Sequence, residues 1–93
     1  MKIVYKLTFA DRLESHIDYL AKYNVKSAKK FHSELIKRIK QISHNPYRYR
    51  KSVYFNDKSI RDLVFKGCTV VFRINNDVIE IFGFARYQEN PVD

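Results

Sequence analysis

The stretch that decides the fold is the last third of the chain, which reads Ile60-Arg-Asp-Leu-Val-Phe-Lys-Gly-Cys-Thr-Val-Val-Phe-Arg-Ile-Asn-Asn-Asp-Val-Ile-Glu-Ile-Phe-Gly-Phe-Ala-Arg-Tyr-Gln-Glu-Asn-Pro91. It contains three runs rich in β-branched and aromatic residues, separated by Lys66-Gly67 and by Asn75-Asn76-Asp77. Such runs are typical of strands, and the separating residues are typical of tight turns. The stretch therefore predicts three consecutive strands joined by hairpins.

A strand and a helix are expected at the start of the chain. Over residues 2–6, the apolar Ile3 and Tyr5 alternate with their neighbours, which is the period of a strand with one buried face. The period then lengthens to that of a helix, because the next apolar residues are Phe9, Leu13, Ile17 and Leu20. This pattern predicts a helix over about residues 9–22, with Thr8 as its N-cap.

A second helix should follow directly, with Asn24 as its N-cap. Asn45-Pro46 should end it, because proline lacks a backbone N–H and disfavours helical backbone at the residue before it. Its apolar stripe consists of Ala28, Phe31, Leu35, Ile39 and Ile42. Since only a short turn separates the two helices, they should form an antiparallel hairpin packed on one face of the sheet.

The predicted fold is α+β, in the order β-α-α-β-β-β, with the helical hairpin on one face of a mainly antiparallel sheet. We expect a single domain over residues 1–93, because a chain of this length buries about 60–65% of its unfolded surface, enough for one modest core. No apolar run approaches the ~20 residues that span a bilayer, and Lys6 interrupts any signal-peptide core. A cytoplasmic protein without a membrane partner is expected. Cys68 is the only cysteine, which excludes an internal disulfide and favours a small buried side chain.

Positive charge is concentrated in the middle of the chain. Residues 24–58 contain ten Lys or Arg and two Asp or Glu, whereas the segments on either side are nearly neutral. Such a concentration favours association with acidic partners but says nothing about the fold. One side of the second predicted helix carries Lys26, Lys29, Lys30, Lys37 and Lys40. This face is either a solvated surface or a docking surface for an acidic protein or nucleic acid.

The segment Pro46-Tyr-Arg-Tyr-Arg-Lys51 is the best local candidate for contact with nucleic acid. Basic side chains such as Arg50 and Lys51 can meet phosphates, while the rings of Tyr47 and Tyr49 can stack on unpaired bases. Alternatively, the two rings fold over the end of the helix and the arginines lie above them. The sequence leaves both interpretations open.

The relative position of Arg61 and Arg73 depends on the turn between their strands. A three-residue loop, Lys66-Gly67-Cys68, would place the two arginines directly opposite each other, whereas a two-residue loop would send them to opposite faces. The glycine slightly favours the three-residue loop, so we expect Arg61 across from Arg73. Opposed cations would need an acidic neighbour, Asp62 or Glu80, or an anionic ligand.

Catalytic templates are mostly absent from the sequence. His16, His32 and His44 have no Cys or carboxylate at ligand spacing, so we expect exposed helix histidines, no metal site and no histidine near the C-terminal strands. There is no glycine-rich phosphate loop or nucleophile elbow, and no cofactor is expected. Metal-free acid–base chemistry on RNA remains, in which basic side chains stabilise phosphorane charge and Tyr or His moves a proton.

The linear order of these weak signals resembles that of the RelE/ParE toxin superfamily, and of its ParE branch in particular. The resemblance covers essentially all 93 residues. It rests on the Asn45-Pro46 stop, Ile60-Arg-Asp-Leu63, Val70-Val-Phe-Arg-Ile74, Asp77-Val-Ile-Glu-Ile81 and Arg86-Tyr-Gln-Glu-Asn-Pro91. It implies a growth-arresting toxin of a two-gene module, inhibited by a cognate antitoxin whose acidic C-terminal segment wraps onto it. ParE-type members poison DNA gyrase, whereas RelE-type members cut mRNA on the ribosome.

The residues favour the ParE side of this resemblance. RNA-cleaving members carry an arginine where this chain has Thr69, and lysines where it has Ile60 and Asp62. We therefore expect a non-enzymatic gyrase inhibitor, with a ribosome-dependent mRNA endonuclease and a non-toxic basic binding module as alternatives. Antitoxin binding is assigned to Lys26, Lys30 and Lys37. Target binding is assigned to Arg61, Arg73, Arg86, Tyr87, Arg50 and Lys51, and catalysis, if the chain is an RNase, to Arg73, Arg86 and Tyr87.

Overall fold

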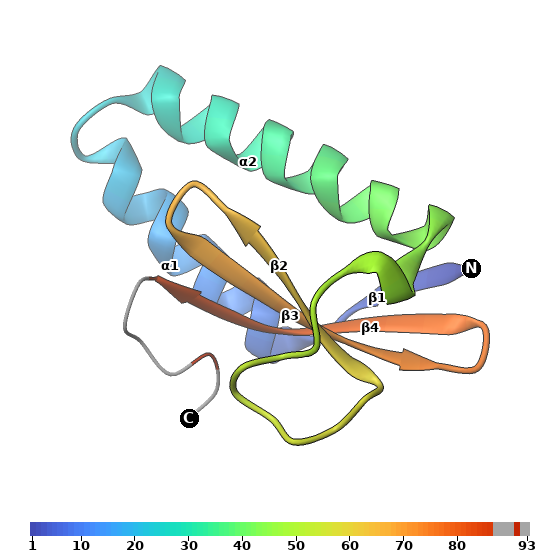
Figure 1. The fold of residues 1–93 in the computed structure, drawn as a ribbon. Coiled ribbons are helices and arrows are strands. Elements are labelled where there is room, and N and C mark those ends of the chain that lie inside the picture. Colours follow the sequence, from blue (N-terminus) through green and yellow to red (C-terminus); the bar gives the residue numbers. More distant parts are fainter. Residues whose placement is uncertain (87–90, 92–93) are drawn as a thin grey trace.

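The computed structural model describes residues 1–86 and Pro91, and these residues form two long helices and a four-stranded sheet (Figure 1). The predicted order β-α-α-β-β-β is confirmed. The elements are β1 (Lys2–Tyr5), α1 (Leu7–Ala21), α2 (Val25–Lys40), the 3₁₀ turns η1 (Gln41–His44) and η2 (Pro46–Arg48), β2 (Ile60–Phe65), β3 (Cys68–Asn75) and β4 (Val78–Arg86). Within the described part of the chain, no helix is long and apolar enough to cross a membrane.

The sheet is mainly antiparallel, as expected, and its strand order is β1-β4-β3-β2. The hairpins β2–β3 and β3–β4 are antiparallel, whereas β1 pairs with β4 in parallel. A register shift in the β3–β4 pairing, between Val71 and Phe72, adds one residue to β4. Such an irregularity bends a strand and increases its local twist.

The expected register between β2 and β3 is wrong by one residue. Phe65 pairs with Cys68, so the loop contains only Lys66 and Gly67, and Arg61 lies opposite Phe72 rather than Arg73. Both loop residues have positive φ angles, 47° and 77°. This is the backbone of a two-residue turn whose twist matches that of the flanking strands, and Lys66 tolerates it next to glycine.

The start of the first helix differs from expectation, the start of the second agrees, and α2 ends at Lys40, before the expected stop at Asn45-Pro46. Helix α1 begins at Leu7, and its N-cap is Lys6, which makes no side-chain capping bond. Thr8 is not the cap, because its hydroxyl donates to the Phe82 carbonyl at 2.6 Å and so joins the start of α1 to β4. Asn24 does cap α2, accepting a hydrogen bond from the Ser27 N–H at 3.0 Å. The chain then leaves the helical path through η1 before Pro46.

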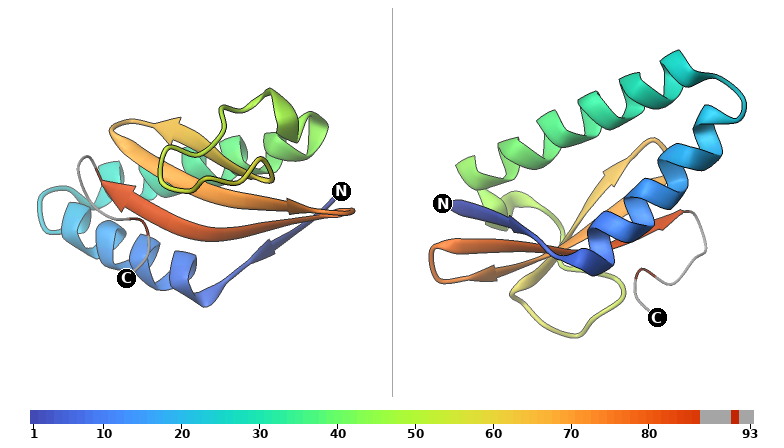
Figure 2. Two further views of the ribbon diagram at one scale, coloured as in Figure 1. Left: turned by 60° about the horizontal axis from the view of Figure 1, so that its bottom comes forward. Right: turned by 180° about the vertical axis from the view of Figure 1, so that it is seen from behind.

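Both helices pack against one face of the sheet, here called the helix-covered face (Figure 2). On β3 this face carries Cys68, Val70, Phe72 and Ile74, all of which are buried. The helices contribute Phe9 and Leu13 from α1, and Phe31, Leu35 and Ile39 from α2. The predicted apolar stripes therefore form the core, with Ile17 and Leu20 packed at its margin.

Residues 49–59, here called the connector, run from the helix-covered face around the edge of β2 to the opposite face. At the beginning, the Tyr49 ring packs edge-on against Phe72, with ring centres 5.6 Å apart. Its backbone then pairs with β2, since the Ser52 N–H donates to the Ile60 carbonyl at 2.9 Å. Further on, the Phe55 ring contacts Phe82. The face that Phe55 covers is called the connector face, and in Figure 1 the connector passes in front of the sheet while α1 lies behind it.

Candidate functional site

Arg61 holds the connector in place. Its guanidinium group donates three hydrogen bonds to main-chain carbonyls, to Lys58 at 2.9 Å, Tyr49 at 3.0 Å and Tyr47 at 3.3 Å. The same group lies over the Tyr47 ring, 5.1 Å from its centre. Arg61, which is expected from the sequence to bind the target, therefore also takes part in the fold. Because β2 is at the edge of the sheet, this side chain can reach around to the connector.

Asp62 is buried, and it pairs with Arg50 of the connector rather than with Arg61 or Arg73 of the sheet. Its carboxylate accepts from Arg50 at 3.2 and 3.3 Å and from the Val53 N–H at 3.1 Å. Glu80, the other acid considered, pairs with Lys6 at 3.4 Å. Arg50 therefore serves the folding of the connector, because a buried carboxylate without its cation is strongly destabilising.

The segment Pro46–Lys51 is largely folded into the molecule. Pro46 is buried, and Tyr49 packs on the core through Phe72. Tyr47 remains 57% exposed, and the Lys51 ammonium group donates to the Asn56 side chain at 3.4 Å. The Tyr49 ring is thus folded into the molecule against β3, while Tyr47 keeps an exposed ring.

Arg73 and Arg86 are on opposite faces of the sheet. Arg73 alternates with Phe72 on β3 and therefore lies on the connector face, where its guanidinium group is 5.4 Å from the Phe82 ring centre. Arg86 ends β4 on the helix-covered face, opposite Cys68, and lies 5.3 Å from the Tyr19 ring centre. The structure does not bring these two predicted site residues together. Tyr87, the third member of the group, lies outside the described residues.

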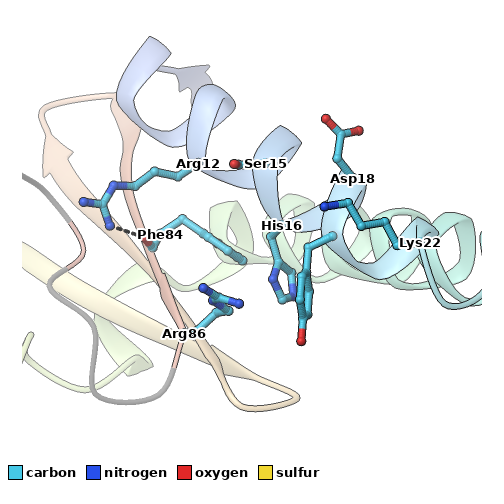
Figure 3. A pocket seen from close by; sticks show the side chains of 8 residues that line it. Arg12, Ser15, His16, Asp18, Lys22, Phe84 and Arg86 are labelled. Carbon is cyan, nitrogen blue, oxygen red and sulfur yellow. Dashed lines mark hydrogen bonds between the residues drawn. The ribbon is translucent and has the colours of Figure 1, made fainter.

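Arg86 instead belongs to a pocket of about 490 Å³ between α1 and the end of β4, here called the α1–β4 pocket (Figure 3). It is lined by Arg12, Ser15, His16, Asp18, Tyr19, Lys22, Phe84 and Arg86. One wall is fixed by Arg12, whose guanidinium group donates to the Phe84 carbonyl at 3.1 Å. Sequence reasoning missed this pocket, because its residues come from segments about seventy positions apart.

His16 lies in this pocket and is half-buried, so the expectation of an exposed histidine is wrong. Its ring packs against Phe31 and Phe84, with ring centres 5.2 and 5.5 Å apart. Its Nε2 atom is 3.8 Å from the Sγ atom of Cys68. The expectation that no histidine lies near the C-terminal strands is therefore also wrong. Helical spacing was the available signal, since His16 follows Leu13 by three residues and shares its side of α1.

Cys68 is buried, as expected. The contact with His16 gives it a polar neighbour that the sequence did not reveal. Among residues 1–86 and Pro91, no group of three or more metal-binding side chains gathers around this pair or elsewhere.

The predicted antitoxin contacts Lys26, Lys30 and Lys37 lie on the exposed surface of α2. Glu34 offsets part of this charge, because its carboxylate is 3.9 Å from the Lys30 ammonium group and accepts a hydrogen bond from Lys66 at 3.0 Å. The bond from Lys66 is also the main reason that the pKa of Glu34 is lowered.

A second hollow lies between the two helices, on the side of α1 away from the α1–β4 pocket, and is here called the interhelical groove. Its volume is about 600 Å³, and its lining is mostly apolar. The residues around it are Tyr5, Phe9, Ala10, Leu13, Glu14, Ile17, Lys29, His32, Ile36 and Lys40. Lys29 and Lys40, which belong to the lysine-rich face, thus border an apolar surface. The sequence did carry a signal for this groove, because Ala10 and Ile36 widen the apolar stripes of the two helices.

Pro91 lies against the sheet. This residue is buried, and its carbonyl accepts a hydrogen bond from the Phe84 N–H at 3.3 Å. It packs against Gly83, where a Cβ atom would lie 3.0 Å from the Val71 Cβ and 3.3 Å from the Pro91 Cβ. Glycine at position 83 therefore permits the close approach of Pro91 to β4.

Comparison with known proteins agrees with this architecture. The sequence model of the ParE toxin of type II toxin–antitoxin systems, parDE, matches residues 3–91. No curated protein matches the chain significantly. Among solved structures, one of the chromosomal ParDE toxin–antitoxin system from P. aeruginosa shares the fold, with a TM-score of 0.77 and 16% sequence identity, over 95% of this chain and 97% of that chain. The match over nearly the whole length shows that this chain belongs to the ParE toxin family of type II toxin–antitoxin systems.

Proposed function

We propose that this toxin inhibits DNA gyrase and is neutralised by a cognate antitoxin that carries an acidic amphipathic segment. The observation that carries the gyrase assignment is the composition of the connector face. The three positions at which RNA-cleaving relatives of this superfamily carry cations are Ile60, Asp62 and Thr69, and all three are on this face. Ile60 is buried, and Asp62 is paired with Arg50. No cation occupies these positions.

Cleavage of RNA requires several donors that converge on one phosphate, and losing one such donor typically costs about a hundredfold in rate. The connector face offers Arg73, whereas Arg86 projects from the other side of the sheet. If the chain were an RNase, catalysis would fall to Arg73, Arg86 and Tyr87. The first two are on opposite faces of the sheet and therefore do not converge on one phosphate. A non-enzymatic mode of action fits this arrangement better.

The interhelical groove supports the proposed mode of neutralisation. Its apolar lining suits the apolar side of an amphipathic helix, which binds grooves through residues at helical spacing. Lys29 and Lys40 at its border, together with the exposed Lys26, Lys30 and Lys37, would meet acidic residues on the other side of that helix. Apolar contacts would supply most of the affinity, and the lysines would accelerate encounter.

The test compares the two targets directly with purified toxin freed of antitoxin. We expect it to inhibit gyrase supercoiling or to trap cleaved DNA, and we expect translated mRNA to remain intact on ribosomes. Addition of the cognate antitoxin should restore supercoiling. Codon-linked mRNA cuts that disappear in Arg86→Ala or Tyr87→Phe would overturn the proposal. In that case the α1–β4 pocket would hold the catalytic groups, since it joins His16 with Arg12 and Arg86.

A further inference from the structure

The α1–β4 pocket combines positive charge with aromatic rings. Among the described residues that line it, three carry a basic side chain, Arg12, Lys22 and Arg86, and one carries a carboxylate, Asp18. Arg12 and Arg86 lie on one side of the His16 ring, and Lys22 and Asp18 lie on the other (Figure 3). The described side chains therefore give the pocket a net positive charge, which is concentrated on the side of Arg12 and Arg86. Its volume of about 490 Å³ is within the range of sites that hold a small ligand or one unit of a polymer.

A row of rings leads out of this pocket along α1. The His16 and Tyr19 rings are stacked, with centres 6.3 Å apart, and the Tyr19 and Tyr23 rings meet edge to face at 5.4 Å. Exposure increases along the row, because Tyr19 is 43% exposed and Tyr23 is 76% exposed. Exposed rings beside basic side chains form a stacking platform, and a nucleobase is a partner that stacks on such rings.

We propose that the α1–β4 pocket and the adjoining Tyr23 ring bind single-stranded nucleic acid. The phosphates lie against Arg12, Lys22 and Arg86, and a base stacks on the exposed tyrosine. Guanidinium groups match the geometry of phosphate oxygens, and the bond from Arg12 to the Phe84 carbonyl fixes one guanidinium group against β4. An acidic peptide would satisfy the cations but would leave the row of rings unused. A duplex would keep its bases stacked internally and out of reach of Tyr23.

This site is separate from the surfaces discussed above. The interhelical groove is on the other side of α1, and the connector face is on the other side of the sheet. Nucleic acid and an antitoxin in the groove would therefore occupy different parts of the molecule. The inference is independent of whether gyrase is the target, because it rests on this pocket alone.

The experiment measures binding of the purified full chain to a fluorescein-labelled oligothymidylate by fluorescence anisotropy over a range of salt concentrations. The logarithm of the affinity should fall linearly with the logarithm of the salt concentration, with a slope of about −0.7 for each neutralised phosphate. Lys22→Ala should make this slope shallower by about 0.7. Tyr23→Ala should weaken binding by at least about fivefold at every salt concentration, because stacking of one base is lost.

Two control variants remove the same groups elsewhere. Lys2→Ala deletes an exposed lysine of β1, and Tyr54→Ala deletes an exposed ring of the connector. Both should bind as the unaltered chain does. The inference is overturned if the oligonucleotide does not bind, if the control variants lose as much affinity as the pocket variants, or if unlabelled duplex DNA competes as well as the single strand. Thermal unfolding should show that all four variants fold, since these side chains are exposed.

Discussion

Arg61 and Arg73, expected to face each other across a hairpin, point to opposite faces of the sheet. Arg61 pairs with Phe72 on the helix-covered face, and Arg73 pairs with Ile60 on the connector face. The two guanidinium groups are consequently not opposed across the hairpin. The acidic neighbour or anionic ligand that opposed cations would need is therefore not required. Arg61 bonds to the connector backbone, and Arg73 lies over the Phe82 ring. Their contributions to function should therefore be separable by mutation.

Arg61→Ala should destabilise the protein, because three main-chain carbonyls lose a charged donor at once. We expect a loss of about 2 kcal/mol in the free energy of unfolding, which corresponds to about 8–16 °C in the thermal midpoint of a domain of this size. Thermal unfolding followed by circular dichroism measures it. Arg48→Ala removes an exposed arginine and should shift the midpoint by only a few degrees. Equal midpoints for the two variants would show that the connector does not depend on Arg61.

Arg50 and Lys51 are neighbours of equal charge that should behave differently. Arg50→Ala leaves the buried Asp62 carboxylate without its cation and should destabilise the chain by about 1–3 kcal/mol. Lys51→Ala should leave stability within about 0.5 kcal/mol, as is usual for an exposed side chain. Growth arrest and thermal midpoints, measured on both, distinguish the two causes of inactivity. If Lys51→Ala abolishes toxicity in a folded protein, Lys51 contacts the target; if toxicity is unchanged, that assignment is wrong.

Ala10→Glu should weaken antitoxin binding without harming the fold. Ala10 is exposed on α1 and lines the interhelical groove, so a glutamate there adds bulk and negative charge where we place an acidic helix. We expect at least a tenfold faster dissociation in surface plasmon resonance. Ser15→Glu is the matched control, because it adds the same side chain to an exposed position of α1 outside the groove lining. Antitoxin binding that tolerates Ala10→Glu would place the antitoxin elsewhere.

The lysine-rich surface of α2 should act mainly on the rate of association. Replacing Lys26, Lys30 and Lys37 by glutamate should slow association with the cognate antitoxin and make it less sensitive to salt, because complementary charge steers encounter. Dissociation should change much less than in Ala10→Glu. Stopped-flow kinetics at several salt concentrations measure both rates. Association as fast as that of the unaltered chain would assign this surface to solubility.

The ion pair between Lys66 and Glu34 should be visible in acid titration. The pKa of Glu34 lies below its ordinary value of 4.5, first because Lys66 donates a hydrogen bond to it. A carboxyl whose pKa is lowered by folding stabilises the native state above its unfolded pKa, and this contribution is lost as the pH falls through the folded pKa. Lys66→Ala should raise the pKa of Glu34 in an NMR titration and reduce that loss. Lys30→Ala, which removes a weaker interaction, should raise it less.

The sequence by itself determined the elements of this fold. The alternating pattern of β1, the helical stripes of α1 and α2, the Asn24 cap and the positions of the turns between the C-terminal strands each depend on neighbours within a few residues. Hydrophobic periodicity is a local property, so it identified the core residues Phe31, Leu35 and Ile39 before any contact was known. The linear order of these elements was also sufficient to indicate the family.

Only the tertiary structure decided what the individual charged side chains do. One residue in the β2–β3 turn determined which face carries Arg73, since successive side chains of a strand alternate between faces. Arg61 became a structural residue because the connector returns to β2, and His16 became part of a pocket with Arg86 because α1 crosses the end of β4. These contacts join residues far apart in the chain, as with His16 and Cys68, and sequence periodicity carries no information about such distances.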